Sequence, residues 1–174
     1  MGNIATPEFL LARWEELSRD PSLQDLPYKI ELNAWGKVEM SPLPGVGHAR
    51  LQTEVARQLA EQLREGVALT ECPVLTDIGV RAPDVVWASD AFRQAHKRSS
   101  PLPRAPEICV EVISPSNLEA ELTEKTRAYL AAGAEEVWLV AQNGTVRFID
   151  RAGERPQSRF AVALKLPDVT HDYL

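Results

Sequence analysis

Residues 106–132, with the sequence PEICVEVISPSNLEAELTEKTRAYLAA, predict a buried strand followed directly by a helix. The first part, residues 107–113, is an almost unbroken apolar run rich in β-branched side chains, which is typical of a central strand covered on both faces. Glu111 interrupts this run with a charge. Either Ser116 or Asn117 can cap the helix that follows, because both side chains offer an oxygen to the free N–H groups of a first helical turn.

The predicted helix carries a lysine in the middle of its apolar face. Positions that advance by four and three residues in turn lie on one side of a helix, and here they hold Leu118, Leu122, Lys125, Tyr129 and Ala132. Burying an unpaired charge is costly, so it normally requires a partner, a metal or a functional reason. In a sheet covered by helices, Lys125 can lie over the strand that contains Glu111. The alternative is that Lys125 extends to solvent and Glu111 lies at a strand end.

The composition is that of an ordinary globular domain. The chain has 174 residues, of which 44% are hydrophobic and 25% are charged, and this balance excludes a globally disordered chain. The net charge of −6 argues against a protein coated in basic residues for loose binding of nucleic acid, but it leaves a local basic groove open. Cys72 and Cys109 form no CxxC motif, so neither a zinc site nor a disulfide framework is expected.

Three features of the sequence bear on its location in the cell. No apolar stretch approaches the length of a membrane span, and no signal peptide precedes the first helix. Together with the unpaired cysteines, this predicts a reducing, cytoplasmic location and no membrane partner. Residues 1–6, MGNIAT, also fit the pattern for N-myristoylation, a short pattern that recurs by chance.

The rest of the chain alternates between strands and helices. Thr6 and Pro7 start a first helix, and Gly36 joins two short strands in a hairpin. Helices or partly helical segments are expected over 48–63 and 88–104, and strands over 28–32, 37–40, 73–80, 83–87, 136–140, 145–149 and 160–164. This order predicts a single α/β domain with a mixed sheet and helices on both faces. Its parts are an N-terminal helix and hairpin (1–44), a core (45–150), and a C-terminal strand and tail (151–174).

His48 and a group of basic residues are further candidates for function. At helical spacing, His48 projects near the centre of the apolar face of its helix, and is either a structural residue or a ligand. The densest basic cluster consists of His96, Lys97, Arg98 and Arg104. It is expected to be a solvated loop, although beside an acidic site it can also touch phosphate.

Two acids lie where they can act together. Asp84 begins one predicted strand and Glu111 lies in the next, and adjacent strands are only about 4.8 Å apart. Two such carboxylates can converge on one divalent ion such as Mg²⁺, which prefers oxygen ligands and keeps several waters. A neighbouring lysine can orient or deprotonate a water and stabilise the negative charge that develops at a phosphate. These are the components needed to hydrolyse a phosphodiester.

The order of these residues resembles a known superfamily of nucleases. Pro83-Asp84, followed by Glu111 in an apolar strand, resembles the PD-(D/E)xK restriction-endonuclease-like superfamily. A larger set is similar to the Uma family of bacterial restriction-endonuclease-like proteins: residues 110–116 (VEVISPS), Glu124-Lys125, Tyr129, Gly133 and residues 136–140 (EVWLV). This resemblance spans nearly the whole chain. It implies a restriction-endonuclease-like fold, in which helices flank a mixed β-sheet with an αβββαβ core.

The resemblance also implies roles for individual residues. It implies a Mg²⁺- or Mn²⁺-dependent endonuclease acting on DNA, with Asp84 and Glu111 as metal ligands and Lys125 positioning water and stabilising the transition state. The superfamily's lysine two residues after the second acid is Ile113 here, and Lys125 matches the position to which the Uma family is thought to have moved it. Possible secondary site residues are Tyr129 beside this lysine, His48, and Glu31 as a third acid or a solvated one.

A different interpretation is a non-catalytic scaffold that binds nucleic acid or protein. It would keep the nuclease fold, with Glu111 and Lys125 as a structural ion pair. Metal binding separates the two interpretations, because only the enzyme needs it. A homodimer would suit an enzyme that cuts DNA, since symmetric dimers are the commonest oligomers and a duplex offers two strands.

Overall fold

The computed structural model describes residues 4–115 and 117–173 of the chain. The N-myristoylation pattern, which depends on residues 1–3, and Ser116 as a helix cap therefore lie outside the described residues. In chain order the elements are α1 (Pro7–Ser18), β1 (Tyr28–Asn33), β2 (Val38–Pro42), α2 (Val46–Gln62), β3 (Gly66–Thr70), β4 (Val74–Thr76), β5 (Gly79–Arg81), β6 (Val85–Ser89), α3 (Asp90–His96), β7 (Ile108–Val112), α4 (Glu119–Ala132), β8 (Glu136–Val140), β9 (Val146–Asp150) and β10 (Gly153–Arg155).

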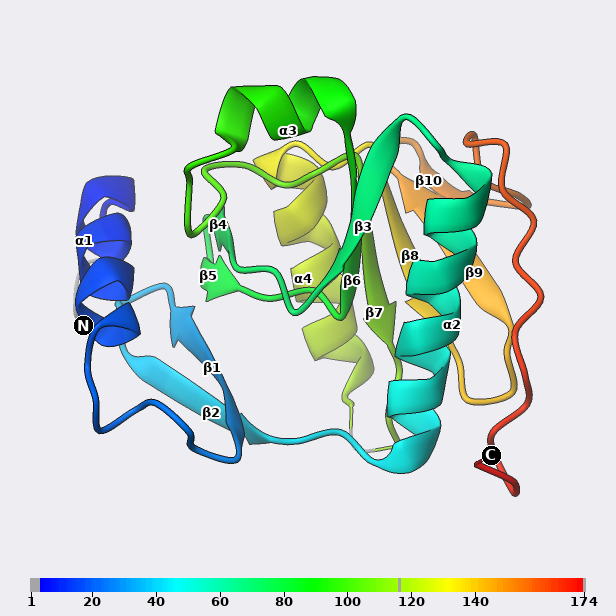
Figure 1. Ribbon diagram of the computed structural model, residues 1–174, viewed down its shortest axis with the longest axis horizontal. Helices are drawn as coiled ribbons and strands as arrows, with labels where there is room; N and C mark the ends of the chain where they lie inside the picture. Colours follow the sequence, from blue (N-terminus) through cyan, green and yellow to red (C-terminus); the bar gives the residue numbers. More distant parts are fainter. Residues whose placement is uncertain (1–3, 116, 174) are drawn as a thin grey trace.

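A six-stranded mixed sheet forms the core, in the order β10-β9-β8-β7-β6-β3. Strands β7 and β8 run parallel, and the other neighbours are antiparallel. Helix α2 covers one face of this sheet and α4 covers the other (Figure 1). The chain order α2, β3, β6, β7, α4, β8 gives the expected αβββαβ core, so the predicted fold is confirmed.

The alternation of side chains along β7 turns Glu111 toward α4. Ile108, Val110 and Val112 pack in the apolar cluster beneath α2, whereas Cys109 packs in the cluster beneath α4. Successive residues of a strand point to opposite faces, so Glu111 lies on the same face as Cys109. The sheet therefore carries this carboxylate to the helix that contains Lys125.

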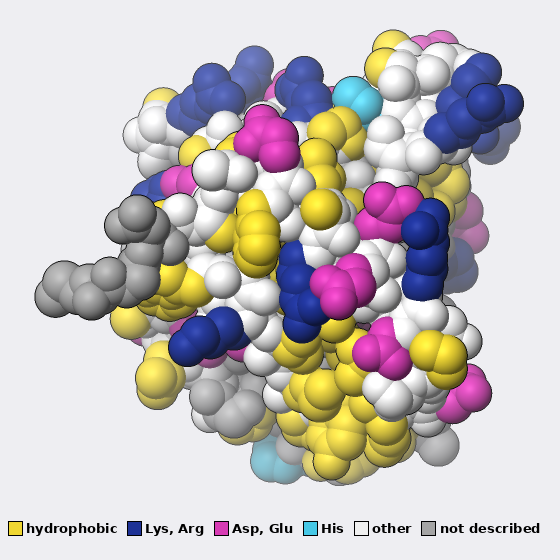
Figure 2. Space-filling view, turned by 90° about the vertical axis from the view of Figure 1, so that its left-hand side faces the viewer, with side chains coloured by type: hydrophobic (Ala, Val, Ile, Leu, Met, Phe, Trp, Pro, Cys, Tyr) yellow, Lys and Arg dark blue, Asp and Glu magenta, His cyan; other side chains and the backbone are white. Residues whose placement is uncertain are grey.

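A smaller sheet, in the order β2-β1-β5-β4, lies beside the core and packs against α1. Thr6 caps α1 as predicted, because its side-chain oxygen accepts a hydrogen bond from the Phe9 amide. Gly36 forms the hairpin turn with a φ of 73°, a backbone conformation that favours glycine. Figure 2 looks onto the side of the molecule where α1 and the hairpin lie; it shows hydrophobic side chains gathered on the lower part of this face and charges of both signs scattered above.

Two strand predictions need correction, and the strands at the two edges of the larger sheet, β3 and β10, were not predicted. The strand expected over 73–80 is split into β4 and β5, which pair antiparallel across a turn at residues 77–78; Gly79, the first residue of β5, has a φ of 118°. Strand β3 pairs with β6. The segment 160–164 is not a strand. Its apolar side chains do pack against the core. However, the backbone N–H and C=O of Ala163 form hydrogen bonds with the side-chain amide of Gln62 instead of with a neighbouring strand.

The start of α4 also differs from the prediction. Asn117 does not cap the helix, because its side-chain oxygen accepts hydrogen bonds from the amide and hydroxyl of Ser114, at 2.8 and 3.0 Å. Leu118 is the N-cap residue and is 70% exposed, so the buried stripe of α4 begins only at Leu122. Both cysteines are free thiols. Within the described residues, none of the helices combines the length and apolar character needed to cross a membrane.

Candidate active site

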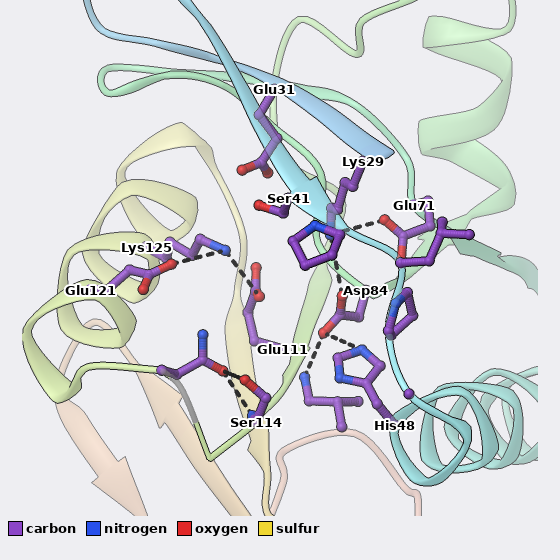
Figure 3. Close-up of a pocket in the computed structure, with 16 residues that line it drawn as sticks. Lys29, Glu31, Ser41, His48, Glu71, Asp84, Glu111, Ser114, Glu121 and Lys125 are labelled. Carbon is purple, nitrogen blue, oxygen red and sulfur yellow. Dashed lines mark hydrogen bonds and ion pairs between the residues drawn. The ribbon is translucent and has the colours of Figure 1, made fainter. Parts of the chain in front are cut away.

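A pocket of about 400 Å³ opens where the two sheets meet (Figure 3). Its walls come from the β1–β2 hairpin, the start of α2, the C-terminal end of β7 and the first turns of α4. Charged groups converge on it: Lys29, Glu31, His48, Glu71, Asp84, Glu111, Glu121 and Lys125. The three residues predicted as catalytic, Asp84, Glu111 and Lys125, therefore lie in one pocket.

Asp84 is held by contacts to both of its carboxylate oxygens. It immediately precedes β6, and the pairing of Val85 with Val110 places it across from Glu111 on the neighbouring strand. Its Oδ2 accepts a hydrogen bond of 2.7 Å from the Val112 amide and lies 3.3 Å from Nε2 of His48. Its Oδ1 lies 3.2 Å from Nζ of Lys29. Burial opposes ionisation, but His48, Lys29 and the Val112 amide outweigh it and lower the pKa of Asp84 to about 2.

Glu111 has the opposite electrostatic character. Its Oε1 accepts a hydrogen bond of 2.7 Å from the hydroxyl of Tyr129, and its Oε2 lies 3.4 Å from Nζ of Lys125. Burial raises the pKa of Glu111, and the negative charge of Asp84 adds to this effect, although Lys125 opposes it. The pocket thus contains one acid that ionises readily and a second whose ionisation is penalised. Such opposed shifts in neighbouring carboxyl groups are typical of functional sites.

Lys125 remains a cation in this pocket. Its Nζ lies 3.4 Å from Glu111 and 3.8 Å from Glu121, and only 14% of its side chain is exposed. Burial disfavours the charged form, but Glu111 and Glu31 outweigh it and raise the pKa of Lys125. A protonated lysine can orient a water molecule and stabilise negative charge, but it cannot accept a proton. In this protonation state Lys125 could orient a water molecule but could not deprotonate it.

Lys29 and Glu71 also line the pocket, although no motif in the sequence marked them as candidates. Nζ of Lys29 bridges two acids, at 2.9 Å from Glu71 and 3.2 Å from Asp84. Lys29 and Glu31 both line the pocket from β1; because residues two apart on a strand share one face, the spacing of Lys29 from Glu31 could have pointed to it. Glu71 has a positive φ of 52°, which is uncommon for a residue other than glycine. No pattern in the sequence indicated this conformation.

The three secondary candidates all lie at or beside the pocket. Nε2 of His48 is buried and faces Oδ2 of Asp84 at 3.3 Å. Glu31 is buried rather than solvated, and its Oε1 accepts a hydrogen bond of 2.7 Å from the Ala82 amide while Oε2 pairs with Arg81. The hydroxyl of Tyr129, one helical turn after Lys125, donates its hydrogen bond to Glu111. The basic cluster around α3 lines no part of this pocket.

The donor set fits a hard divalent cation. Mg²⁺ commonly binds through one or two carboxylates and keeps several water ligands, and Asp84 and Glu111 offer carboxylate oxygens from adjacent strands. Among the described residues, no three His, Cys, Asp or Glu side chains are grouped closely enough to enclose an ion by themselves. A cation at this site would therefore keep waters in its shell, which is where a hydrolytic nucleophile would be found.

Comparison with known proteins identifies the family. Residues 14–170 match the family model of Uma2, which is described as a putative restriction endonuclease. The chain belongs to the Uma2 family. The solved structure of a putative nuclease of DUF820 from Anabaena variabilis ATCC 29413 has a similar fold, with a TM-score of 0.63 and 20% sequence identity. This likeness covers 86% of the present Uma2 chain and 84% of the other. No curated protein is significantly similar in sequence.

Proposed function

We propose that this Uma2 protein is a Mg²⁺-dependent endonuclease that hydrolyses phosphodiester bonds of DNA in the pocket between the two sheets. The family and the fold support a nuclease. The observation that carries the finer proposal is the pairing of Asp84 and Glu111, two buried carboxylates of opposite pKa shift, with a lysine that stays protonated.

In the proposed reaction, two carboxylates would bind the cation and a lysine would act on the water and the phosphate. Asp84 is ionised at neutral pH and fixed by the Val112 amide, so it offers a pre-oriented oxygen ligand. Ionised Glu111 would offer the second, and Tyr129 and Lys125 hold it in place. The bound cation would supply a polarised water and neutralise charge on the phosphate. Lys125 would orient that water and stabilise the negative charge that develops in the transition state.

One observation favours the scaffold interpretation instead. Each carboxylate already has a lysine partner, Lys29 for Asp84 at 3.2 Å and Lys125 for Glu111 at 3.4 Å. These pairs compensate the buried charges without a metal. A protein that binds nucleic acid or another protein through this fold would need only these ion pairs for stability.

Calorimetric titration with Mg²⁺ or Mn²⁺ tests the proposal. The wild type should bind the ion, and Asp84→Ala and Glu111→Ala should each abolish binding. Asp90→Ala, which removes an exposed acid at the start of α3, should have no effect. Lys125→Met should keep the metal but lower the rate of plasmid and branched-DNA cleavage by about 10²-fold or more, the usual effect of removing a group that stabilises transition-state charge. If the wild type binds no ion and charge deletions only lower the melting temperature, the ion pairs are structural.

A further inference from the structure

A second pocket, of about 500 Å³, lies next to the acidic one, along β1. The linings of the two pockets share Lys29, Leu43, Pro44 and Glu71, so the pockets adjoin along these residues. The ion pair between Lys29 and Glu71 lies on the boundary between them. A ligand that crosses this boundary would contact both pockets.

The chemistry of the second pocket differs from that of the first. Its walls include two aromatic side chains, Trp14 and Tyr28, together with Ile30, Pro73 and Ala82. Tyr28 is 46% exposed, so its ring is free to accept a partner. Pockets that bind small organic groups are lined in this way, by apolar and aromatic side chains with a few polar groups at the edge.

The position of β1 accounts for this change of character. The side chains of Lys29 and Glu31 line the acidic pocket, whereas Tyr28 and Ile30 line only the apolar one. Strand β1 pairs with β5 only through Leu32 and Asn33, so the first half of its edge is not covered by β5. One strand thus carries charges to one pocket and apolar side chains to the other.

We propose that the apolar pocket binds the base of an unpaired nucleotide whose phosphate lies in the acidic pocket, and that the substrate therefore contains a single-stranded segment. This inference rests on the proposed nuclease function. A nucleotide joins an anionic phosphate to a flat aromatic base, and the two pockets offer matching surroundings side by side. Aromatic side chains stack on bases without regard to sequence. A base within a duplex is paired and stacked, so it reaches such a pocket only when it is unpaired or flipped out.

Fluorescence anisotropy with three labelled DNA probes of equal length tests this inference: a single strand, a blunt duplex, and a duplex with a single-stranded overhang. Ca²⁺ replaces Mg²⁺ so that binding is measured without cleavage. We expect the single strand and the overhang probe to bind about tenfold more tightly than the blunt duplex, because stacking of one base on an aromatic side chain is typically worth about that much. A single strand that lacks its bases should lose this advantage.

Variants of Tyr28 test whether the tighter binding of single-stranded DNA depends on the apolar pocket. Tyr28→Ala should weaken binding of the single strand about tenfold and leave binding of the blunt duplex unchanged. Tyr28→Phe keeps the ring and should bind like the wild type. Trp35→Ala removes another exposed aromatic side chain, in the β1–β2 turn, that lines neither pocket, and should also bind like the wild type.

The possible failures can be told apart. If the wild type binds the blunt duplex as tightly as the single strand, and Tyr28→Ala changes neither affinity, the base pocket is wrong while the nuclease proposal stands. If no probe binds in the presence of the cation, both proposals are wrong. The free edge of β1 would then be better explained by an added peptide strand.

Discussion

The hydroxyl of Tyr129 donates a hydrogen bond of 2.7 Å to Oε1 of Glu111, and both residues are almost completely buried. This contact connects the sheet to the helix that covers it, because Glu111 comes from β7 and Tyr129 from α4. It also favours the ionised form of Glu111, against the effect of burial.

Tyr129→Phe should destabilise the protein by about 1–3 kcal/mol, because a buried carboxylate oxygen loses its donor. The loss should be larger at high pH than at low pH, since the missing hydrogen bond favours only the charged form of Glu111. Urea unfolding at several pH values measures both effects. Tyr173→Phe, at an exposed position, serves as the control and should change stability little. A loss that does not vary with pH would show that the hydroxyl does not act through Glu111.

The metal-free protein should lose stability in acid, because protonation of Asp84 removes a stabilising contribution. The pKa of Asp84 falls from 3.8 to about 2 on folding, so the unfolded chain binds a proton more readily than the native state between these values. Asp84 therefore contributes about 2 kcal/mol to the free energy of unfolding. This contribution is complete above pH 3.8 and is lost as the pH falls toward 2.

Asp84→Asn removes this contribution, so the difference in unfolding free energy between wild type and variant should shrink as the pH falls toward 2. Chemical denaturation in the presence of EDTA gives this difference directly. A difference that stays constant from pH 6 to about 2 would mean that the carboxylate is not selectively stabilised in its charged form.

The third prediction concerns the side chain of Gln58, which holds the chain segment after β10 against α2. Both backbone groups of Lys165 bond to the side-chain amide of Gln58, at 2.8 Å each. Gln58→Met should leave them without this partner, lower stability by about 1–3 kcal/mol, and speed amide exchange in residues 160–166. The control Gln94→Met lies on the exposed surface of α3 and should change neither. Equal exchange rates in wild type and Gln58→Met would contradict this role.

The pairing of Glu111 with Lys125 was predictable because both positions break an apolar pattern. A charge in a continuous apolar strand and a lysine in an apolar helical stripe are visible in the sequence, and the structure places their charged groups 3.4 Å apart. The fold was predictable for the same reason, since long apolar strands and amphipathic helices leave strong periodic signals. The family resemblance pointed to the same residues.

The rest of the site was harder to predict because its partners come from distant loops and edges. Lys29 reaches Asp84 across 55 positions of sequence, and it lies on a strand whose alternation is also that of an ordinary solvated surface. In segment 160–164, large apolar side chains alternate with alanines although the segment is not a strand. Such alternation therefore indicates that one side of a segment is buried, but it does not show that the backbone pairs with another strand. Phe160, Val162 and Leu164 pack on the core, while glutamines of α2 satisfy the backbone nearby.

Lys29 offers a further test of the proposed metal site. Its Nζ lies between Asp84 and Glu71, and these acids raise its pKa despite burial, so it is positively charged at neutral pH. A cation that binds Asp84 must share the site with this charge. Lys29→Met keeps most of the apolar stem but removes the repulsion, so it should tighten Mg²⁺ binding by about tenfold, the effect of about 1.4 kcal/mol.

Calorimetry on Lys29→Met measures this change, with Lys37→Met in the exposed hairpin turn as the matched control. The control should bind Mg²⁺ as the wild type does. Weaker binding in Lys29→Met, at unchanged melting temperature, would mean that the lysine orients Asp84 for the ion rather than competing with it. An unchanged affinity would place the ion away from Asp84, and would contradict the assignment of that carboxylate as a ligand.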